Sequence, residues 1–105
     1  MNILFVCSRN KWRSRTAETI FKSNQAHDVR SAGTENDARI KINEKLIQWS
    51  DLIFVMEKKH KQRLQEKFEY LMHDKQVVIL DIEDHYQYMD EELIESLKIS
   101  VMPFL

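Results

Sequence analysis

Four short apolar runs constrain the fold of this chain more than any other feature of its sequence. They span residues 2–7, 28–32, 52–56 and 77–80. All but the second are continuously apolar, as strands buried on both faces of a parallel sheet are. Segments with apolar residues at helical spacing follow each run, for example Leu64, Phe68 and Leu71. This order predicts a doubly wound α/β fold, in which a four-stranded parallel sheet has helices on both faces.

The length and the single cysteine limit the organisation of the chain. Its 105 residues suit one α/β domain over residues 1–105. Cys7 is the only cysteine, so an internal disulfide is excluded and a reducing compartment is expected, which favours the cytoplasm. The apolar run near the N-terminus is too short for a signal-peptide core or a membrane span, so we expect no membrane partner.

Charge is distributed unevenly along the chain. A net charge of −1 makes a general nucleic-acid binder an unlikely interpretation. The first fifteen residues nevertheless hold four cations and no acid, namely Arg9, Lys11, Arg13 and Arg15. Such a cationic cluster attracts phosphate. Nothing in the sequence indicates an oligomeric state.

A cysteine and an arginine, separated by five residues, follow the first predicted strand. Cys7 ends the strand, and Arg13 lies where the next helix is expected to begin. Five residues are enough for a loop to curl around one tetrahedral anion with backbone N–H groups pointing inward, and the helix N-terminus adds its positive end. Arg13 can hold two phosphate oxygens at once, a geometry that Lys does not offer. Because the same donors favour the thiolate form of Cys7, the loop combines an anion site with a nucleophile.

The loop residues are therefore expected to bind the phosphoryl group. Asn10 suits a tight loop because Asn adopts positive φ more readily than most residues. Ser14 is placed to donate a hydrogen bond to the sulfur, and Trp12 is expected either to stack on a substrate ring or to pack against the first helix. With Cys7 and Arg13 as catalytic residues, the expected substrate-binding residues of this region are Ser8, Arg9, Asn10, Lys11, Trp12 and Ser14.

These residues resemble the low-molecular-weight protein tyrosine phosphatase family. The shared motif is a strand ending Val6-Cys7, five loop residues, and then Arg13-Ser14 at the start of a helix. Similar segments follow in the family's order at residues 16–18, 31–34, 51–57 and 84–88. The resemblance implies a phosphomonoester hydrolase, in particular a protein tyrosine phosphatase, that forms a cysteinyl-phosphate. It implies no metal or other cofactor, and a phosphorylated protein or a small aryl phosphate as the substrate.

The resemblance also implies which residue is the acid. Asp84 is followed by Tyr86 and Tyr88, as the family's acid is followed by aromatic residues. By similarity Asp84 protonates the leaving group and then activates water, and the two tyrosines line the cleft. Asp81 and Asp90 are the alternative acids, and packing at the sheet edge is the alternative role for the tyrosines.

The segment between Thr34 and Asp51 is shorter than in the family, which has there a cleft-lining loop and a histidine that supports the phosphate loop. We therefore expect a more open site, with the loop supported by Asn10, Ser14 and Ser31 alone. The histidines show no spacing typical of a metal site and are interpreted as surface residues; they are His27, His60, His73 and His85.

Two further differences lie within the loop. Trp12 occupies the position where many family members have a second cysteine that protects the nucleophile, so oxidised Cys7 would need an external thiol for its recovery. Arg9 and Lys11 replace small or apolar residues and make the mouth of the site more cationic. This favours substrates that carry extra negative charge.

Three other readings remain at this point. The chain could be a phosphate- or phosphoprotein-binding regulator with weak or no turnover, or a thiol-dependent arsenate reductase on the same fold. The reductase is the weaker hypothesis, because related enzymes use additional cysteines and this chain has none. Alternatively, Cys7 could be a buried structural cysteine beside an unrelated basic turn.

Overall fold

The computed structural model describes residues 1–105, and strands alternate with helices along the chain. The strands are β1 (Asn2–Cys7), β2 (Asp28–Gly33), β3 (Leu52–Val55) and β4 (Gln76–Ile79). The helices are α1 (Arg13–Phe21), α2 (Glu44–Trp49), α3 (Lys58–Met72) and α4 (Glu91–Val101), followed by the short 3-10 helix η1 (Met102–Phe104). The predicted order of elements is confirmed.

The element boundaries differ slightly from those expected. β2 extends through Gly33, β3 ends at Val55, and β4 is displaced by one residue toward the N-terminus. Ile42 has helical spacing to Leu46, but it lies before α2 and is buried there. Helix α2 begins only after Asn43, whose side chain accepts a hydrogen bond from the Leu46 N–H and so caps the first turn.

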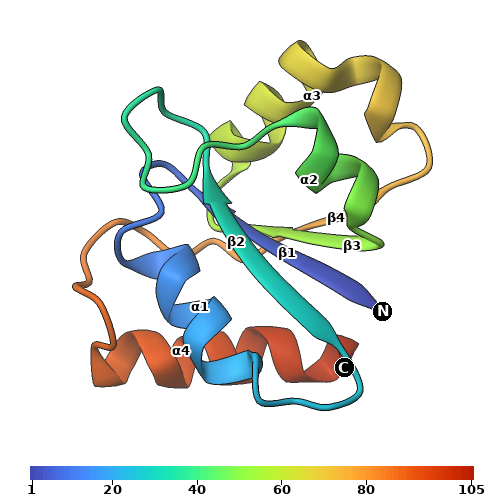
Figure 1. The fold of residues 1–105 in the computed structure, drawn as a ribbon. Coiled ribbons are helices and arrows are strands. Elements are labelled where there is room, and N and C mark those ends of the chain that lie inside the picture. Colours follow the sequence, from blue (N-terminus) through green and yellow to red (C-terminus); the bar gives the residue numbers. More distant parts are fainter.

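The sheet has the order β2-β1-β3-β4, and all its strands are parallel. β1 and β3 occupy the centre, which explains why their sequences are continuously apolar. The chain first crosses from β1 to β2 on one side and then returns to β3 on the other (Figure 1). This reversal leaves a crevice at the carboxyl ends of β1 and β3, the usual ligand site of such sheets.

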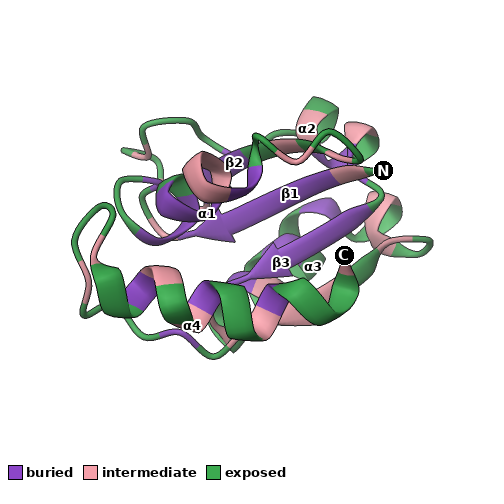
Figure 2. Ribbon diagram, turned by 90° about the horizontal axis from the view of Figure 1, so that it is seen from below, coloured by how far each residue is buried: buried purple, intermediate pink, exposed green.

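Helices cover both faces of the sheet, as predicted. Helices α1 and α4 pack on one face, where the ring of Phe5 stacks between those of Phe21 and Phe54 at centroid distances of 5.7 and 5.2 Å. Helices α2 and α3 pack on the other face, over a second apolar cluster that includes Leu4 and Ile53. Figure 2 shows the buried residues concentrated on the central strands and on the side of α4 that faces the sheet. None of the helices combines the length and the apolar character needed to span a bilayer.

Candidate active site

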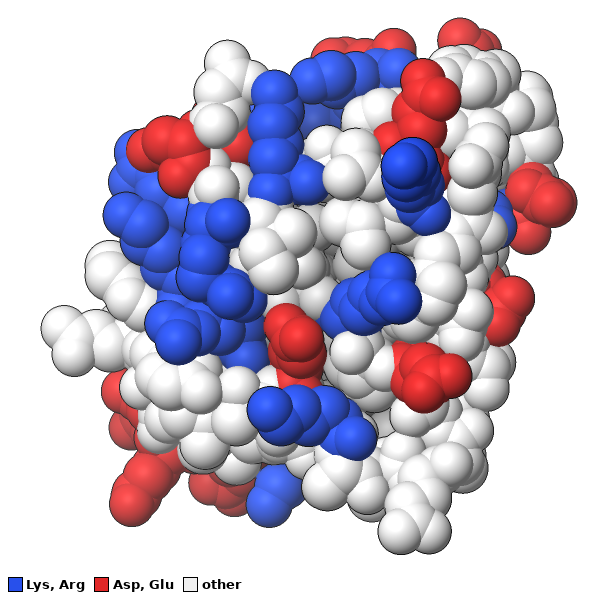
Figure 3. All heavy atoms as spheres, viewed as in Figure 1, with Lys and Arg blue, Asp and Glu red and all other residues white.

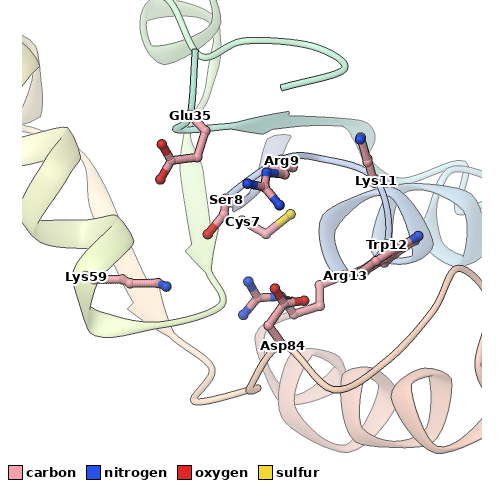
Figure 4. Close-up of a pocket in the computed structure, with 9 residues that line it drawn as sticks. All are labelled: Cys7, Ser8, Arg9, Lys11, Trp12, Arg13, Glu35, Lys59 and Asp84. Atoms are coloured by element: carbon pink, nitrogen blue, oxygen red, sulfur yellow. Dashed lines mark ion pairs between the residues drawn. The ribbon is translucent and has the colours of Figure 1, made fainter. Parts of the chain in front are cut away.

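A polar pocket opens at the carboxyl end of β1, where the chain turns into α1. Its volume is about 290 Å³. The lining residues come from the β1–α1 loop, from the segment after β2, from the start of α3 and from the connection between β4 and α4 (Figure 4). They are Cys7, Ser8, Arg9, Lys11, Trp12, Arg13, Glu35, Lys59 and Asp84. The structure thus brings Asp84 to the same cavity as Cys7 and Arg13, although Asp84 lies in a distant part of the chain.

The sulfur of Cys7 lies beneath this pocket and is nearly buried, at 3% exposure. Its Sγ atom is 3.2 Å from the backbone nitrogen of Asn10, which donates to it, and 2.9 Å from Ser14 Oγ. Ser14 Oγ accepts a hydrogen bond from Asn10 Nδ2 at 2.7 Å, so its own hydrogen goes to one of two acceptors. These are the sulfur at 2.9 Å and the carbonyl oxygen of Ala32 at 3.4 Å, and the shorter contact favours the sulfur. Two donors therefore point at Cys7 and stabilise negative charge on it.

Asn10 gives the loop its shape. Its φ of 58° lies in the left-handed region, which Asn tolerates better than most residues. The side chain is fully buried, and its Nδ2 donates to Ser14 and also to Ser31 at 2.8 Å. The expected support of the loop by Asn10, Ser14 and Ser31 is therefore present, although Asn10 and Ser14 lie under the loop and do not line the pocket.

Arg13 extends from the first turn of α1 into the wall of the pocket and is only 2% exposed. Its Nη1 donates to Glu57 Oε2 at 2.6 Å and to the carbonyl oxygen of Ile82 at 2.8 Å. Its Nε lies 3.6 Å from Asp84 Oδ1, and the Asp84 side chain is about half exposed. Nη1 is therefore fixed by the protein, while Nε and Nη2 donate no hydrogen bond within it.

Glu57 was not recognised as a site residue from the sequence. Burial by itself would raise the pKa of this carboxyl group, but the hydrogen bond from Arg13 and the charges of Arg13 and Lys59 outweigh that effect and lower it. Glu57 is thus a carboxylate that fixes Arg13. Its place directly after β3, at the same sheet edge as Cys7, is the signal that could have identified it.

The interpretation of His60 as a surface residue is wrong. Its side chain is 1% exposed, and its Nε2 lies 2.9 Å from Ser8 Oγ. Its Nδ1 accepts the backbone N–H of Glu57 at 3.0 Å. Burial and the charge of Arg13 lower the pKa of His60 from 6.5 to about 4, so the ring is neutral near pH 7. None of the four histidines lines the pocket itself, and no group of His, Cys, Asp or Glu side chains is arranged to hold a metal ion.

The expectation that three residues alone support the loop is also wrong. Besides His60, the segment after β2 contacts the loop backbone directly. The N–H groups of Thr34, Glu35 and Arg39 donate to the carbonyl oxygens of Cys7, Ser8 and Arg9 at 3.0, 2.9 and 2.9 Å. This parallel set of backbone contacts extends the β1–β2 pairing into the loop, which sequence patterns cannot reveal.

The tyrosines expected to wall the cleft do not line the pocket. Tyr86 packs against the apolar cluster on the α1 and α4 face. The Tyr88 hydroxyl lies 2.8 Å from Thr19 Oγ1, and the guanidinium of Arg15 lies 4.4 Å from the Tyr88 ring centroid. Trp12, by contrast, lines the pocket and is 44% exposed, so its ring is accessible to a substrate.

The two alternative acids lie elsewhere than the pocket. Asp90 accepts from the N–H groups of Glu92 and Leu93 and so caps α4. Asp81 is exposed and does not line the cavity. Asp84 is therefore the aspartate that the structure brings to Arg13.

The mouth of the pocket is cationic, but its charges are partly paired. Figure 3 shows Lys and Arg side chains gathered on the side where the β1–α1 and β2–α2 connections lie in Figure 1. Arg9 lies 3.4 Å from Asp37, and Lys59 lies 3.8 Å from Glu57. Lys11 is the cation of the pocket that forms no ion pair, so the expected positive rim depends most on this residue.

Residues 2–49 match the sequence model of the family described as low molecular weight phosphotyrosine protein phosphatase. No curated protein matches the chain at a significant level.

Solved structures match over almost the whole chain. A YwlE mutant from Bacillus subtilis is 24% identical, with 100% of this chain and 99% of that chain covered and a TM-score of 0.71. The tyrosine phosphatase Wzb from Escherichia coli K30, solved with phosphate, is 19% identical, with coverages of 98% and 94% and a TM-score of 0.79. The YwlE arginine phosphatase from Geobacillus stearothermophilus is 21% identical, with coverages of 93% and 84% and a TM-score of 0.72. The resemblance to the low molecular weight phosphotyrosine protein phosphatase family is therefore confirmed, in sequence over residues 2–49 and in fold over the whole chain.

Proposed function

We propose that this chain is a cysteine-dependent phosphatase that hydrolyses phosphomonoesters, with phosphotyrosine or a similar aryl phosphate as its substrate. The observation that carries the proposal is the arrangement around Cys7. A sulfur that receives two hydrogen bonds, a curled loop of backbone N–H groups and the guanidinium of Arg13 meet at one pocket. This arrangement suits binding of a tetrahedral anion and attack on its phosphorus atom.

In the first step, Cys7 Sγ attacks the phosphorus atom, and the bond to the leaving oxygen breaks. Arg13 holds two phosphoryl oxygens through Nε and Nη2, since Nη1 is already engaged by Glu57 and Ile82. Asp84 gives its proton to the leaving oxygen. Asp84 Oδ1 lies 3.6 Å from Arg13 Nε, which is longer than a hydrogen bond. The bound phosphate can therefore replace Asp84 at the guanidinium.

In the second step, the Asp84 carboxylate accepts a proton from water, and the resulting nucleophile attacks the cysteinyl-phosphate. The S–P bond breaks, inorganic phosphate leaves, and the thiolate of Cys7 is restored. Asn10 N–H and Ser14 Oγ stabilise the departing thiolate by the same hydrogen bonds that they make in the free protein. No metal or cofactor takes part.

Phosphoarginine is the second candidate substrate. YwlE from Geobacillus stearothermophilus is described as an arginine phosphatase and shares the fold. Two carboxylates, Glu35 and Asp84, line the pocket, and a guanidinium that carries a phosphoryl group would meet them there.

We further propose that residues 1–105 act as one phosphatase-like domain in the cytoplasm, which agrees with a single reduced cysteine.

The test is a turnover screen with aryl phosphates, phosphotyrosine and phosphoarginine peptides, nucleotides and sugar phosphates. Wild-type protein should release phosphate from an aryl phosphate or phosphotyrosine peptide, and Cys7→Ser should abolish release while phosphate binding remains. Turnover that survives Cys7→Ser would refute the mechanism. Phosphopeptide binding without any release would instead support the regulator hypothesis.

The role of Asp84 is tested by the leaving group. Asp84→Asn should lower kcat by roughly 10²-fold or more for poor leaving groups and much less for nitrophenolate, because only the poor ones need the proton. Glu83→Gln is the matched control, since Glu83 is an exposed carboxylate one position away that does not line the pocket. Equal losses for good and poor leaving groups would exclude Asp84 as the acid.

A further inference from the structure

A chain of hydrogen bonds leads from the backbone after β3 to the rim of the phosphate loop. The N–H of Glu57 donates to His60 Nδ1 at 3.0 Å, and His60 Nε2 lies 2.9 Å from Ser8 Oγ. His60 is buried, whereas Ser8 lines the pocket. Figure 4 shows the Ser8 oxygen on the side of Cys7 that faces Lys59 and the start of α3. The middle member, His60, thus lies inside the protein, and the last one, Ser8, lies at the cavity.

The position of each hydrogen follows from this geometry. His60 Nδ1 accepts a backbone N–H, so it carries no hydrogen of its own. The single hydrogen of the neutral ring is therefore on Nε2, and Ser8 Oγ accepts it. A ring in this tautomer cannot take a proton from Ser8, which excludes a serine nucleophile activated by His60. Ser8 Oγ has no other hydrogen-bond partner in the protein, so its own hydrogen remains available to a ligand.

We propose that His60 is a positioning residue that directs the hydroxyl hydrogen of Ser8 into the pocket, where it is donated to an oxygen of the bound phosphoryl group. Ser8 then adds a side-chain donor to the backbone N–H groups of the loop. This inference depends on the proposed phosphate site, but it does not depend on turnover or on the identity of the leaving group.

The proposal requires that His60 stay neutral where the protein works. The charged and titratable groups that act on the ring are Arg13 from α1, Glu57 before α3, and Lys59 and Arg63 on α3. Three of them are cations, and the ring is buried, so protonation is disfavoured. The contribution of Ser8 should accordingly be the same throughout the range from about pH 5 to pH 8.

Binding of inorganic phosphate, measured by calorimetry, is the first test. Ser8→Ala should weaken binding roughly tenfold or more, because it removes a hydrogen bond to a charged group. Ser8→Thr keeps the hydroxyl and should bind within about threefold of wild type. Ser23→Ala is the control, since Ser23 is exposed after α1 and does not line the pocket. Equal affinities for wild type and Ser8→Ala would overturn the proposal.

Variants of His60 separate positioning from packing. His60→Asn keeps an acceptor and a donor, whereas His60→Leu fills the space without either. The His60→Asn variant should retain more phosphate affinity than His60→Leu. Adding Ser8→Ala to His60→Leu should weaken phosphate binding little further. Two results would show that His60 has only a structural role. One is equal phosphate affinity of the Leu and Asn variants; the other is a loss of affinity from Ser8→Ala that is as large in the His60→Leu background as in wild type.

Kinetics distinguish this inference from the proposed function. The ratio of wild-type kcat/KM to that of Ser8→Ala on an aryl phosphate should be constant from about pH 5 to pH 8, and a ratio that changes with an apparent pKa near 6.5 would contradict it. If no substrate turns over but phosphate binding falls in Ser8→Ala, the proposed catalysis fails and the inference stands. If turnover occurs and every Ser8 variant matches wild type, the inference alone fails.

Discussion

Protonation of His60 should couple the stability of the fold to pH. The pKa of this buried side chain is lowered from 6.5 to about 4, so between these values the unfolded chain binds a proton that the folded chain does not. Stability must therefore fall as the pH drops through this window, because protons favour the state that binds them. With these two pKa values, the free energy of unfolding at pH 5 is about 2 kcal/mol lower than at pH 8 through His60 alone. Above pH 7 the contribution is complete.

Urea denaturation of wild type and His60→Asn at several pH values isolates this contribution. The variant loses packing and hydrogen bonds, so it is less stable at pH 8. The gap between the two proteins should narrow by about 2 kcal/mol at pH 5, because only wild type carries the histidine penalty. His73→Asn is the control, since His73 is exposed at the end of α3, and its gap to wild type should not change with pH. If the difference in free energy of unfolding between wild type and His60→Asn stays constant from pH 8 to pH 5 to within about 0.5 kcal/mol, His60 is not a buried neutral ring.

The remaining predictions concern the core, the loop and the rim. Phe54→Ala should lower the free energy of unfolding by about 3–5 kcal/mol in urea denaturation, because Phe54 is fully buried between two aromatic neighbours; a loss below about 1 kcal/mol would contradict this packing. Gly33→Ala would place a Cβ 2.6 Å from the carbonyl oxygen of Ser8. It should therefore lower the free energy of unfolding by about 1–3 kcal/mol and lower kcat/KM. Unchanged kinetics would show that the loop backbone can shift without affecting the site. Lys11→Ser should lower kcat/KM severalfold for acid-flanked phosphopeptides and leave neutral ones unchanged, whereas Lys45→Ser on α2 should affect neither; equal losses on both peptides would exclude charge selection by Lys11.

Much of the fold was accessible from the sequence because its determinants are local. The continuous apolar runs of β1 and β3 predict strands buried on both faces, and the helical spacing of Leu64, Phe68 and Leu71 predicts a helix. The bounds of β1 were predicted correctly, whereas those of β2, β3 and β4 were off by one residue, because the end of a strand depends on the pairing partner. Gly33, for example, extends β2 through its pairing with Cys7.

Apart from Asp84 and Ser31, which were expected and lie at the site, the candidate site was predictable only where it is continuous in sequence. The loop from Cys7 to Arg13, the left-handed Asn10 and the contact between Ser14 and Cys7 follow from residue types within eight positions. Tyr86 and Tyr88 follow Asp84 in sequence, yet neither lines the pocket, because the backbone between β4 and α4 turns them toward the helix layer and toward α1.

The sequence by itself determined the βα alternation and the nucleophile loop, since both depend on periodicity and short-range spacing. Only the tertiary structure decided that Glu57 fixes Arg13 and that His60 lies buried against Ser8. These pairs are 44 and 52 residues apart, and they meet because β1 and β3 pair in parallel, so that their carboxyl ends reach the same sheet edge. No pattern along the chain encodes that register, which is set by the packing of helices on both faces of the sheet. The same packing removes water from His60 and so keeps it neutral.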